Sequence, residues 1–356
     1  MINIKINKGQ FTLSKWDKIK FEYKRGKGYI FRYLLNRFKW HYYPRLHYIS
    51  KFPDHVDIEI STNCNMHCPM CYTTTKEFKN NVGRQFMSFA LFKKIIDECV
   101  SYNIFSIRLS LRGESFIHPD IVRMIKYAHN KGIKEISSLT NGLALTPELF
   151  EQALDAGLTW LTISIDGIGK TYESIRVPAK FDDIVEKVKK YHAIKKRKKS
   201  IKPVIKIQSI WPAIKDNYKE YYTIFSPYVD NVSSNPLIDY LGKDDNSKIE
   251  YEKNFDCPVL YQRIAIGANG RVLLCSNDEM GKYILGNANK ESIYDIWHGK
   301  RIKYVRELHK KHIGYKKIEP CKECYLPRKT APVVEMIGDK KIIIDKYIGR
   351  TEEIGK

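Results

Sequence analysis

From residue 56 onward, short stretches of alternating apolar and polar residues are followed by longer segments with apolar residues at helical spacing. Strands are predicted at 56–61, 105–111, 134–139, 159–166, 203–210 and 228–233. Helices are predicted between them, at 92–100, 121–129, 147–156, 182–194 and 217–225, with Thr146 as the N-cap of the third. Because strands that alternate with helices build a parallel sheet, the pattern predicts an α/β fold with an open or partial (β/α)6 barrel.

Within the predicted strands apolar and polar residues alternate, whereas parallel strands buried on both faces are usually continuous apolar runs. In the first strand, Asp57 and Glu59 alternate with Val and Ile residues. The apolar face is expected to meet the outer helices, so the polar face lines the inside. Since unpaired buried charges are costly, we predict a wide polar cavity for a hydrophilic substrate and a cofactor at the C-terminal ends of the strands. The alternative is that Arg108 only pairs with Asp57 or Glu59 as scaffold.

The first 54 residues form a basic, aromatic arm in front of this pattern. A helix is predicted there, with an apolar face made of Ile30, Phe31, Leu34, Leu35 and Phe38. We expect this face to pack on the domain behind it. The alternative is a peripheral contact in which the basic amphipathic helix lies on a membrane surface.

The composition is that of a globular protein with an unusual charge. The chain of 356 residues is long enough for about two domains, and 43% of its residues are hydrophobic. Its net charge is +22. A basic surface attracts nucleic acid, anionic lipid or phosphorylated substrates. Since Lys, Ile, Tyr and Asn are all abundant, we interpret the charge as a general residue bias and do not expect nucleic acid as a partner. Without a signal-peptide pattern or a run of ~20 apolar residues, we expect a cytoplasmic protein.

Seven of the eight cysteines fall into two groups with metal-ligand spacing, and Cys99 stands alone on a predicted buried helix face. Clustered cysteines without a secretory signal favour metal binding over disulfides. The first group, Cys64, Cys68 and Cys71, has C-x3-C-x2-C spacing directly after the first strand. Three thiolates around one inorganic cluster leave a fourth metal position open, which is typical of a catalytic site. A zinc knuckle with His67 as fourth ligand is the alternative.

This loop resembles the cluster motif C-x3-C-x-φ-C of the radical S-adenosylmethionine (radical SAM) enzymes, with Met70 as the apolar φ residue. The resemblance implies a [4Fe–4S] cluster held by Cys64, Cys68 and Cys71, with SAM on the fourth iron. It also implies reductive cleavage of SAM to a 5′-deoxyadenosyl radical, with electrons from a reducing protein such as flavodoxin or ferredoxin. The cofactor supplies this chemistry, and the protein positions and shields it.

Further motifs at the predicted strand ends resemble the SAM-binding segments of the same family. Arg112-Gly113-Glu114 resembles the Gly-Gly-Glu motif that meets the SAM amino group, with Arg112 in place of the first Gly. Arg176 resembles the basic residue that often pairs with the methionine carboxylate. The segments that hydrogen-bond the ribose and this carboxylate are matched by Thr140, Asn141, Ser164 and Asp166. The resemblance covers about residues 55–235.

The second cysteine group is Cys257, Cys275, Cys321 and Cys324, with 17 and 45 residues between its first three members. Gly270 and Cys275 have G-x4-C spacing at the end of a predicted hairpin, 260–266 with 272–274. This segment and the four cysteines resemble the SPASM/twitch domains in their shorter form. The resemblance implies an auxiliary [4Fe–4S] cluster on these four thiolates; a structural zinc site is the alternative. The resulting domains are the arm 1–54, the radical SAM core 55–240, a small α+β auxiliary-cluster domain 250–335, and a tail 336–356 with a short hairpin at 342–344 and 347–348.

Four protein thiolates leave no open iron on the auxiliary cluster, so we expect it to accept an electron in a net oxidation. Cys99 is predicted to face the core, so the sequence offers no thiol as hydrogen donor and no catalytic acid or base is assigned. We therefore predict an oxidoreductase that attacks a C–H of a polar small molecule, such as a carbinol carbon of a sugar or polyol. The alternatives are modification of a peptide or protein side chain, a zinc-stabilised basic nucleic-acid-binding module, or an inactive scaffold.

Overall fold

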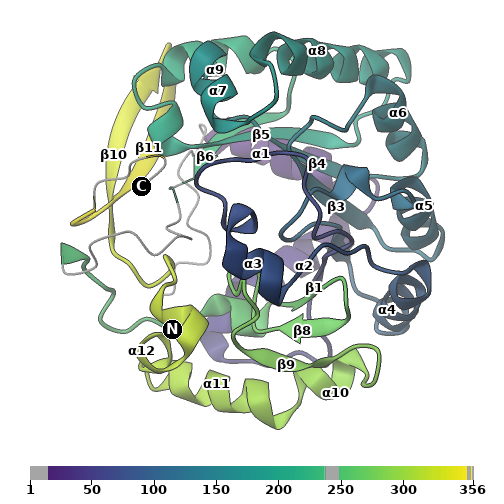
Figure 1. The fold of residues 1–356 in the computed structure, drawn as a ribbon, viewed down its shortest axis with the longest axis vertical. Helices are drawn as coiled ribbons and strands as arrows, with labels where there is room; N and C mark the ends of the chain where they lie inside the picture. The colour runs from purple at the N-terminus through teal and green to yellow at the C-terminus, as the bar shows by residue number, and fades with distance from the viewer. Residues whose placement is uncertain (1–14, 236, 238–247, 351–353, 355–356) are drawn as a thin grey trace.

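The structure is a computed structural model that describes residues 15–235, 237, 248–350 and 354. Nine of the described strands form one sheet that curves around the centre of the molecule (Figure 1). They are β1 (His55–Ile58), β2 (Ser106–Arg108), β3 (Glu135–Thr140), β4 (Trp160–Ser164), β5 (Val204–Ile210), β6 (Asn231–Asn235), β7 (Arg263–Ile266), β8 (Arg271–Leu273) and β9 (Ile284–Asn287). The order is β6-β5-β4-β3-β2-β1-β7-β8-β9, and neighbours are parallel from β6 through to β7.

Helices cover the outside of this sheet (Figure 1). The long outer helices are α4 (Phe89–Ser101), α5 (Ile121–Asn130), α6 (Pro147–Asp155), α8 (Phe181–Arg197) and α9 (Tyr218–Phe225). Ser88 and Thr146 cap α4 and α6, since their hydroxyls accept hydrogen bonds from backbone N–H groups three residues on. The shorter helices of this part are α3 (Lys76–Asn81), α7 (Gly169–Ile175) and the 3-10 turns Tyr72–Thr74, Ser115–Ile117 and Trp211–Ala213.

The predicted parallel α/β architecture is confirmed. Every strand and helix predicted between residues 56 and 235 is present, with boundaries shifted by at most three residues. Thr146 is the predicted N-cap. The apolar residues of the strands are fully buried against the outer helices, as their alternation predicts, and Cys99 is buried on α4.

The polar face of β1 is filled by ion pairs. Arg108 Nε lies 2.9 Å from Asp57 Oδ1, and Arg112 donates from Nε and Nη2 to the two carboxylate oxygens of Glu59. Asp57 and Glu59 have no solvent exposure, so the prediction that they line an open polar cavity is wrong. The predicted pairing of Arg108 with Asp57 is confirmed.

The C-terminal strands continue the same sheet. β7 and β8 form the predicted hairpin, and β9 adds to it in antiparallel direction. β7 also pairs in parallel with β1, with Val56 opposite Ile264, which the sequence did not predict. This part begins with the 3-10 turn Pro258–Tyr261 before β7. It ends in the helices α10 (Ile293–Trp297), α11 (Lys300–Lys310), α12 (Gly314–Lys317) and α13 (Glu319–Lys322).

A separate hairpin of β10 (Thr330–Ile337) and β11 (Lys340–Tyr347) follows. The short hairpin predicted in the tail is therefore wrong, since 342–344 and 347 lie on one strand. The turn lies at Gly338, whose φ of 55° suits a glycine and reverses the chain. Tyr218 of α9 joins this hairpin to the barrel through a 3.0 Å hydrogen bond to Glu335.

Two N-terminal helices, α1 (Lys15–Gly26) and α2 (Ile30–Tyr42), lie behind the sheet in Figure 1. A 3-10 turn, Pro44–Leu46, follows them. α2 buries Tyr33, Asn36 and Trp40, and its predicted packing face is exposed instead, so that prediction is wrong. The reason is that the large rings of Tyr33 and Trp40 contact Phe105 and His55 at the N-terminal ends of the strands. None of the described helices combines the length and apolar character needed to cross a membrane.

A buried ion pair between Arg25 of α1 and Glu135 of β3 holds α1 to the barrel, with oxygen–nitrogen distances of 3.0 and 3.1 Å. We expect Arg25→Met to lower the free energy of unfolding by about 3–5 kcal/mol, because it leaves the Glu135 carboxylate buried and unpaired. The exposed pair Lys189–Glu186 provides the control, and Lys189→Met should change stability by less than about 1 kcal/mol. Urea unfolding of both variants measures the difference.

The same pair predicts a pH dependence. Burial opposes ionisation of Glu135, but the Arg25 guanidinium overrides it and holds the pKa of Glu135 below its ordinary value. A carboxyl whose pKa is lower in the folded state stabilises the fold above its unfolded pKa of about 4.3, and this contribution is lost as the pH falls further. The deficit of Arg25→Met should therefore be full at neutral pH and shrink in acid. A deficit that is independent of pH would contradict this account.

Candidate functional site

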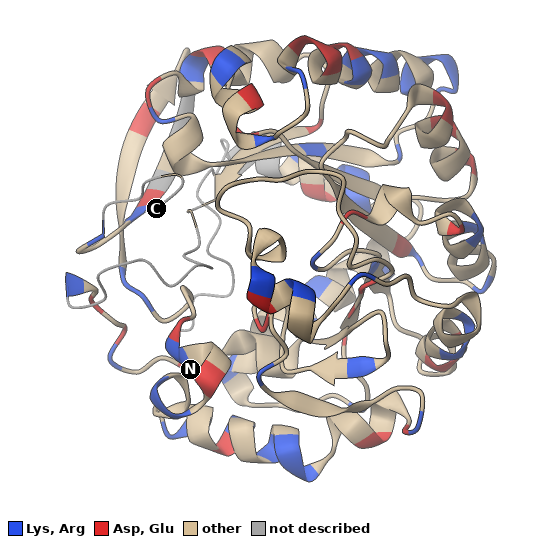
Figure 2. Ribbon diagram, in the orientation of Figure 1, with Lys and Arg blue, Asp and Glu red and all other residues tan. Residues whose placement is uncertain are grey.

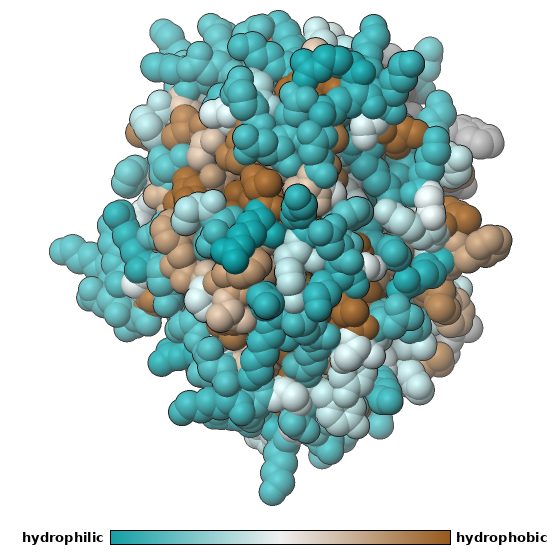
Figure 3. Space-filling view, turned by 90° about the vertical axis from the view of Figure 1, so that its right-hand side faces the viewer, coloured by the Kyte–Doolittle hydropathy of each residue, from teal (hydrophilic) through white to brown (hydrophobic). Residues whose placement is uncertain are grey.

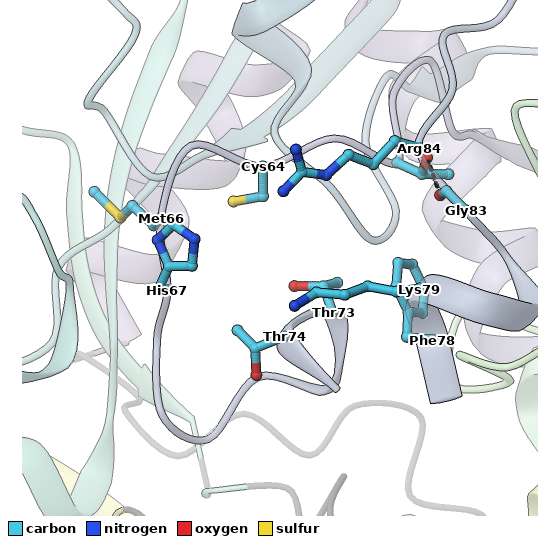
Figure 4. A pocket seen from close by; sticks show the side chains of 10 residues that line it. Cys64, Met66, His67, Thr73, Thr74, Phe78, Lys79, Gly83 and Arg84 are labelled. Atoms are coloured by element: carbon cyan, nitrogen blue, oxygen red, sulfur yellow. Dashed lines mark hydrogen bonds between the residues drawn. The ribbon is translucent and has the colours of Figure 1, made fainter. Parts of the chain in front are cut away.

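The first cysteine group lies on the loop that follows β1, at the C-terminal end of the parallel strands. Cys68 is buried, while Cys64 and Cys71 are half-buried. The pKa of the Cys68 thiol is raised to about 11, chiefly by burial and in part by the neighbouring Cys71 and Cys64, while Arg176 opposes this shift. Figure 4 shows Cys64 and His67 beside a cavity of about 30 Å³, with the side chains of Lys79 and Arg84 extending toward it.

Nitrogen donors face the sulfur atoms. Asn141 Nδ2 lies 3.7 Å from Cys64 Sγ, and Arg176 Nη1 lies 3.9 Å from Cys68 Sγ. Thiols with raised pKa values and nearby N–H donors fit an iron–sulfur cluster, since a bound metal keeps them as thiolates and the donors stabilise its negative charge. Within the described residues, no three Cys, His, Asp or Glu side chains are grouped as ligands of one metal ion. In a four-iron cluster each thiolate binds a different iron.

Glu114 connects the ends of β2 and β3 to the cysteine loop. Its buried carboxylate accepts hydrogen bonds from Thr140 Oγ1 and Asn141 N, both at 2.7 Å, and its own N–H donates to Asn63 O. Burial raises the pKa of Glu114, while these hydrogen bonds favour the charged form. The structure therefore brings Glu114, Thr140 and Asn141 together beside Cys64.

Gly113 lies against the backbone of the same loop. A Cβ atom at this position would lie 2.4 Å from Asn63 O and 2.6 Å from Ser61 O. Both contacts are with backbone atoms, so only glycine permits this approach of the β2 end to the cysteine loop.

Asp166 and Arg176 form a buried ion pair after β4. Arg176 Nε donates to Asp166 Oδ2 at 2.7 Å, and Ile210 N donates to Asp166 Oδ1 at 2.8 Å. Burial opposes the charge of Arg176, but Asp166 and Cys68 together hold its pKa above the ordinary value. Arg176 is thus a permanent cation beside the first thiol group. Of the remaining predicted residues, Ser164 lies at the end of β4 in register with Gln208 of β5, and Met70 packs against the core.

The second cysteine group comes together from three separate segments, because Cys321 and Cys324 lie on the same one. Burial, together with the nearby Cys324, raises the pKa of Cys257 to about 12. Burial also raises the pKa of Cys275 and Cys321, helped by the neighbouring thiols. Asn277 approaches two of these sulfur atoms, with its N–H 3.4 Å from Cys275 Sγ and its Nδ2 3.7 Å from Cys324 Sγ. Four half-buried cysteines with nearby N–H donors fit a fully protein-bound cluster.

An ion-pair network missed at the sequence level lies between the two groups. Arg112 pairs with Glu59, and its Nη1 also donates to the backbone oxygen of Glu279 at 2.8 Å. Burial raises the pKa of the Glu279 carboxyl to about 8, with Asp278 adding to the effect. Arg112 replaces the first Gly of the Gly-Gly-Glu pattern. This replacement was the signal in the sequence that Arg112 has a role of its own. Its partners are 53 and 167 residues away, so no local pattern names them.

Comparison with known proteins agrees with this geometry. The sequence model of the Radical SAM superfamily matches residues 58–210, and that of an iron–sulfur cluster-binding domain, SPASM, matches residues 257–325. Together the two matches cover more than half of the chain. The chain belongs to the radical SAM superfamily. Membership implies SAM, a [4Fe–4S] cluster and an auxiliary cluster as cofactors.

Curated relatives of this radical SAM protein match only in part. A probable GTP 3′,8-cyclase of Methanococcus maripaludis is 30% identical over 135 residues, which is 37% of this chain and 43% of the relative. The Fe-coproporphyrin III synthase of Methanosarcina barkeri is 30% identical over 119 residues, 33% of this chain and 28% of the relative. The chain thus matches less than half the length of these relatives.

Two solved structures share the fold. BtrN in complex with AdoMet and 2-DOIA superposes with a TM-score of 0.55 at 18% identity, over 78% of this chain and 94% of BtrN. Streptococcus suis SuiB bound to S-adenosylmethionine superposes with a TM-score of 0.56 at 15% identity, over 83% of this chain and 78% of SuiB. These similarities confirm the predicted fold class.

Proposed function

We propose that this radical SAM protein binds a [4Fe–4S] cluster through Cys64, Cys68 and Cys71, cleaves SAM reductively, and oxidises a C–H of a polar small molecule. The observation that carries the proposal is the position of Cys64 beside Asn141, which also binds the Glu114 carboxylate, on the same loop as the buried Cys68. When bound, the cluster supplies the electron that cleaves SAM. The residues of the chain position SAM and exclude water.

The protein offers SAM one anion and one cation. The Glu114 carboxylate suits the SAM ammonium group, and the ends of β3 and β4 offer Thr140, Asn141 and Ser164 to the ribose and methionine parts. Arg176 suits the methionine carboxylate, while its own ion pair with Asp166 fixes the guanidinium in place. Both charged groups lie within reach of the cysteine loop.

The second thiol group supports a net oxidation. A cluster held by Cys257, Cys275, Cys321 and Cys324 supplies an electron acceptor whose four irons all have protein ligands. A carbinol substrate would become a carbonyl compound by giving a hydrogen atom to the 5′-deoxyadenosyl radical, a proton to solvent and an electron to the auxiliary cluster, and these three losses balance the reaction. Glu279 and Arg112 lie between the two groups, so they are candidates for contact with a hydroxylated substrate.

The proposal is tested by anaerobic reconstitution of the full chain, followed by assay of iron, sulfide and 5′-deoxyadenosine after addition of SAM and dithionite. About eight irons per chain are expected from two four-iron clusters. Deuterated polyols and sugars, compared with deuterated peptides, then show which class transfers deuterium to 5′-deoxyadenosine. Zinc without sulfide, or no 5′-deoxyadenosine from fully loaded protein, would overturn the proposal. Deuterium transfer from peptides alone would replace its substrate class.

Substitution of Glu114 tests the SAM site directly. We expect Glu114→Gln to weaken SAM binding about 10- to 100-fold, because a charge-assisted hydrogen bond contributes about 1.5–3 kcal/mol. Equilibrium binding of SAM to reconstituted protein without reductant measures the change. Glu186→Gln on the exposed face of α8 is the control and should bind SAM as wild type does. Equal affinity of all three proteins would remove Glu114 from the site.

A further inference from the structure

One face of α2 is apolar and uncovered. Phe31, Leu34, Leu35 and Phe38 follow one another at spacing i, i+3, i+4, i+7 and are 84%, 56%, 55% and 52% exposed. We call these four residues the apolar face of α2. Figure 3 shows hydrophobic side chains at its right-hand edge, the side behind the sheet where Figure 1 places α1 and α2. Large apolar groups gathered on one helix face mark an interaction surface.

The segment of the chain that carries this face is basic in sequence. Residues 23–53 contain eight Lys or Arg and two His, and no Asp or Glu. The outer helices differ, because Figure 2 shows both signs of charge along α8 and α6, where Lys198 pairs with Glu151. Lys24, Arg25 and Lys39 of this segment pair with Asp230, Glu135 and Asp54. Lys27, Arg32 and Arg45 are left to face a partner, and an apolar stripe beside such cations is complementary to an anionic surface with an apolar interior.

The helix is held rigidly, with the apolar face pointing outward. Asn36 Nδ2 donates to Asp54 O, and Trp40 packs on His55 at a centroid distance of 6.1 Å. These contacts are at the N-terminal end of β1, whereas the cysteine loop follows its C-terminal end. A partner bound to α2 therefore leaves the strand ends that carry Glu114 and the thiols accessible.

We propose that the apolar face of α2 docks the protein on an anionic phospholipid bilayer, with the helix lying in the plane of the interface. Phe and Leu side chains enter the acyl boundary, and Lys27, Arg32 and Arg45 reach the headgroups with their long stems. A second copy of this chain fits less well, because a symmetric dimer would set the cations Lys27, Arg32 and Arg45 of the two copies against each other. Nucleic acid would leave the apolar stripe in water.

Flotation with lipid vesicles tests this docking surface. The full chain is mixed with vesicles of phosphatidylcholine alone or of phosphatidylcholine with phosphatidylglycerol, at low and high salt. We expect binding only to the anionic vesicles, and weaker binding at high salt because the charges are screened. The double variant Leu34→Asp, Phe38→Asp should lower the partition coefficient by about tenfold or more. Lys27→Glu with Arg45→Glu should lower binding to anionic vesicles only.

Tyr304→Asp is the matched control, because Tyr304 is also an exposed apolar side chain on a helix, α11, and is 57% exposed. It should bind anionic vesicles as wild type does, and circular dichroism should show that all variants are folded. Equal binding of wild type and Leu34→Asp, Phe38→Asp would overturn the proposal. Equal binding of wild type to neutral and anionic vesicles would also overturn it. A wild-type dimer in sedimentation that Leu34→Asp, Phe38→Asp dissociates, while Tyr304→Asp does not, would overturn it as well.

Discussion

Replacement of Cys68 with alanine is expected to abolish formation of 5′-deoxyadenosine from SAM. Cys68 is the most buried of the first three thiols and lies beside Arg176, so its loss leaves two ligands and a cation without a thiolate partner. An iron–sulfur cluster held by two thiolates has no stable place in this loop. Anaerobic reconstitution with dithionite and SAM, followed by chromatography of the products, measures the loss. Iron content should fall by about half.

Cys99→Ala provides the matched control for this experiment. Cys99 is fully buried on α4, and burial raises the pKa of its thiol far above the ordinary value, so it is a small apolar core residue. The variant should keep its iron and cleave SAM at the rate of wild type. Full cleavage by Cys68→Ala, or equal loss in both variants, would show that the first thiol group does not hold the reactive cluster.

Cys321→Ala is expected to separate the two halves of the reaction. The second thiol group has its own hydrogen bonds from Asn277, so its loss should leave the first group and the SAM contacts in place. We therefore expect 5′-deoxyadenosine formation to continue, while iron and sulfide fall by about half and oxidised product is no longer made. Metal analysis and product assays on one preparation measure both effects.

Lys322→Ala is the control for Cys321→Ala, since Lys322 is adjacent on α13 and makes only a surface ion pair with Glu319. It should retain both activities. Loss of SAM cleavage in Cys321→Ala, with zinc in place of iron in the wild type, would instead assign the second group to a structural zinc site.

The arrangement of Arg112 shows how the two halves of the molecule are joined. Arg112 at the end of β2 bridges Glu59 after β1 and the backbone of Glu279 after β8, while β7 pairs with β1. The two matched regions therefore share one continuous sheet rather than meeting as separate bodies. A change at Arg112 would act on both cysteine groups at once.

Most of the barrel could be predicted because its signals are local. Strand alternation and the 3.6-residue helical period are properties of a few neighbouring residues, and Thr146 caps α6 with a hydroxyl three residues from its partner. The spacing of Cys64, Cys68 and Cys71 is local in the same sense, and so it indicates a cluster before any fold is known.

The helix α2 shows where this reasoning ends. Its period correctly identifies which side is apolar, but the side that the barrel covers carries Tyr33, Asn36 and Trp40. Which side of a helix is covered depends on the element behind it, and aromatic side chains with polar edges can form that contact as well as aliphatic ones.

By itself the sequence determined the order of strands and helices, the two cysteine groups and the family to which they point. Each of these depends on the spacing of residues that are close together in the sequence. Only the tertiary structure decided which charges are paired, which helix face is left in water, and that β7 extends the barrel sheet. These depend on contacts between residues far apart in the chain, such as Glu59 with Arg112 and Arg25 with Glu135. These charges must be paired because they are buried, and a segment becomes buried only when the rest of the chain folds against it.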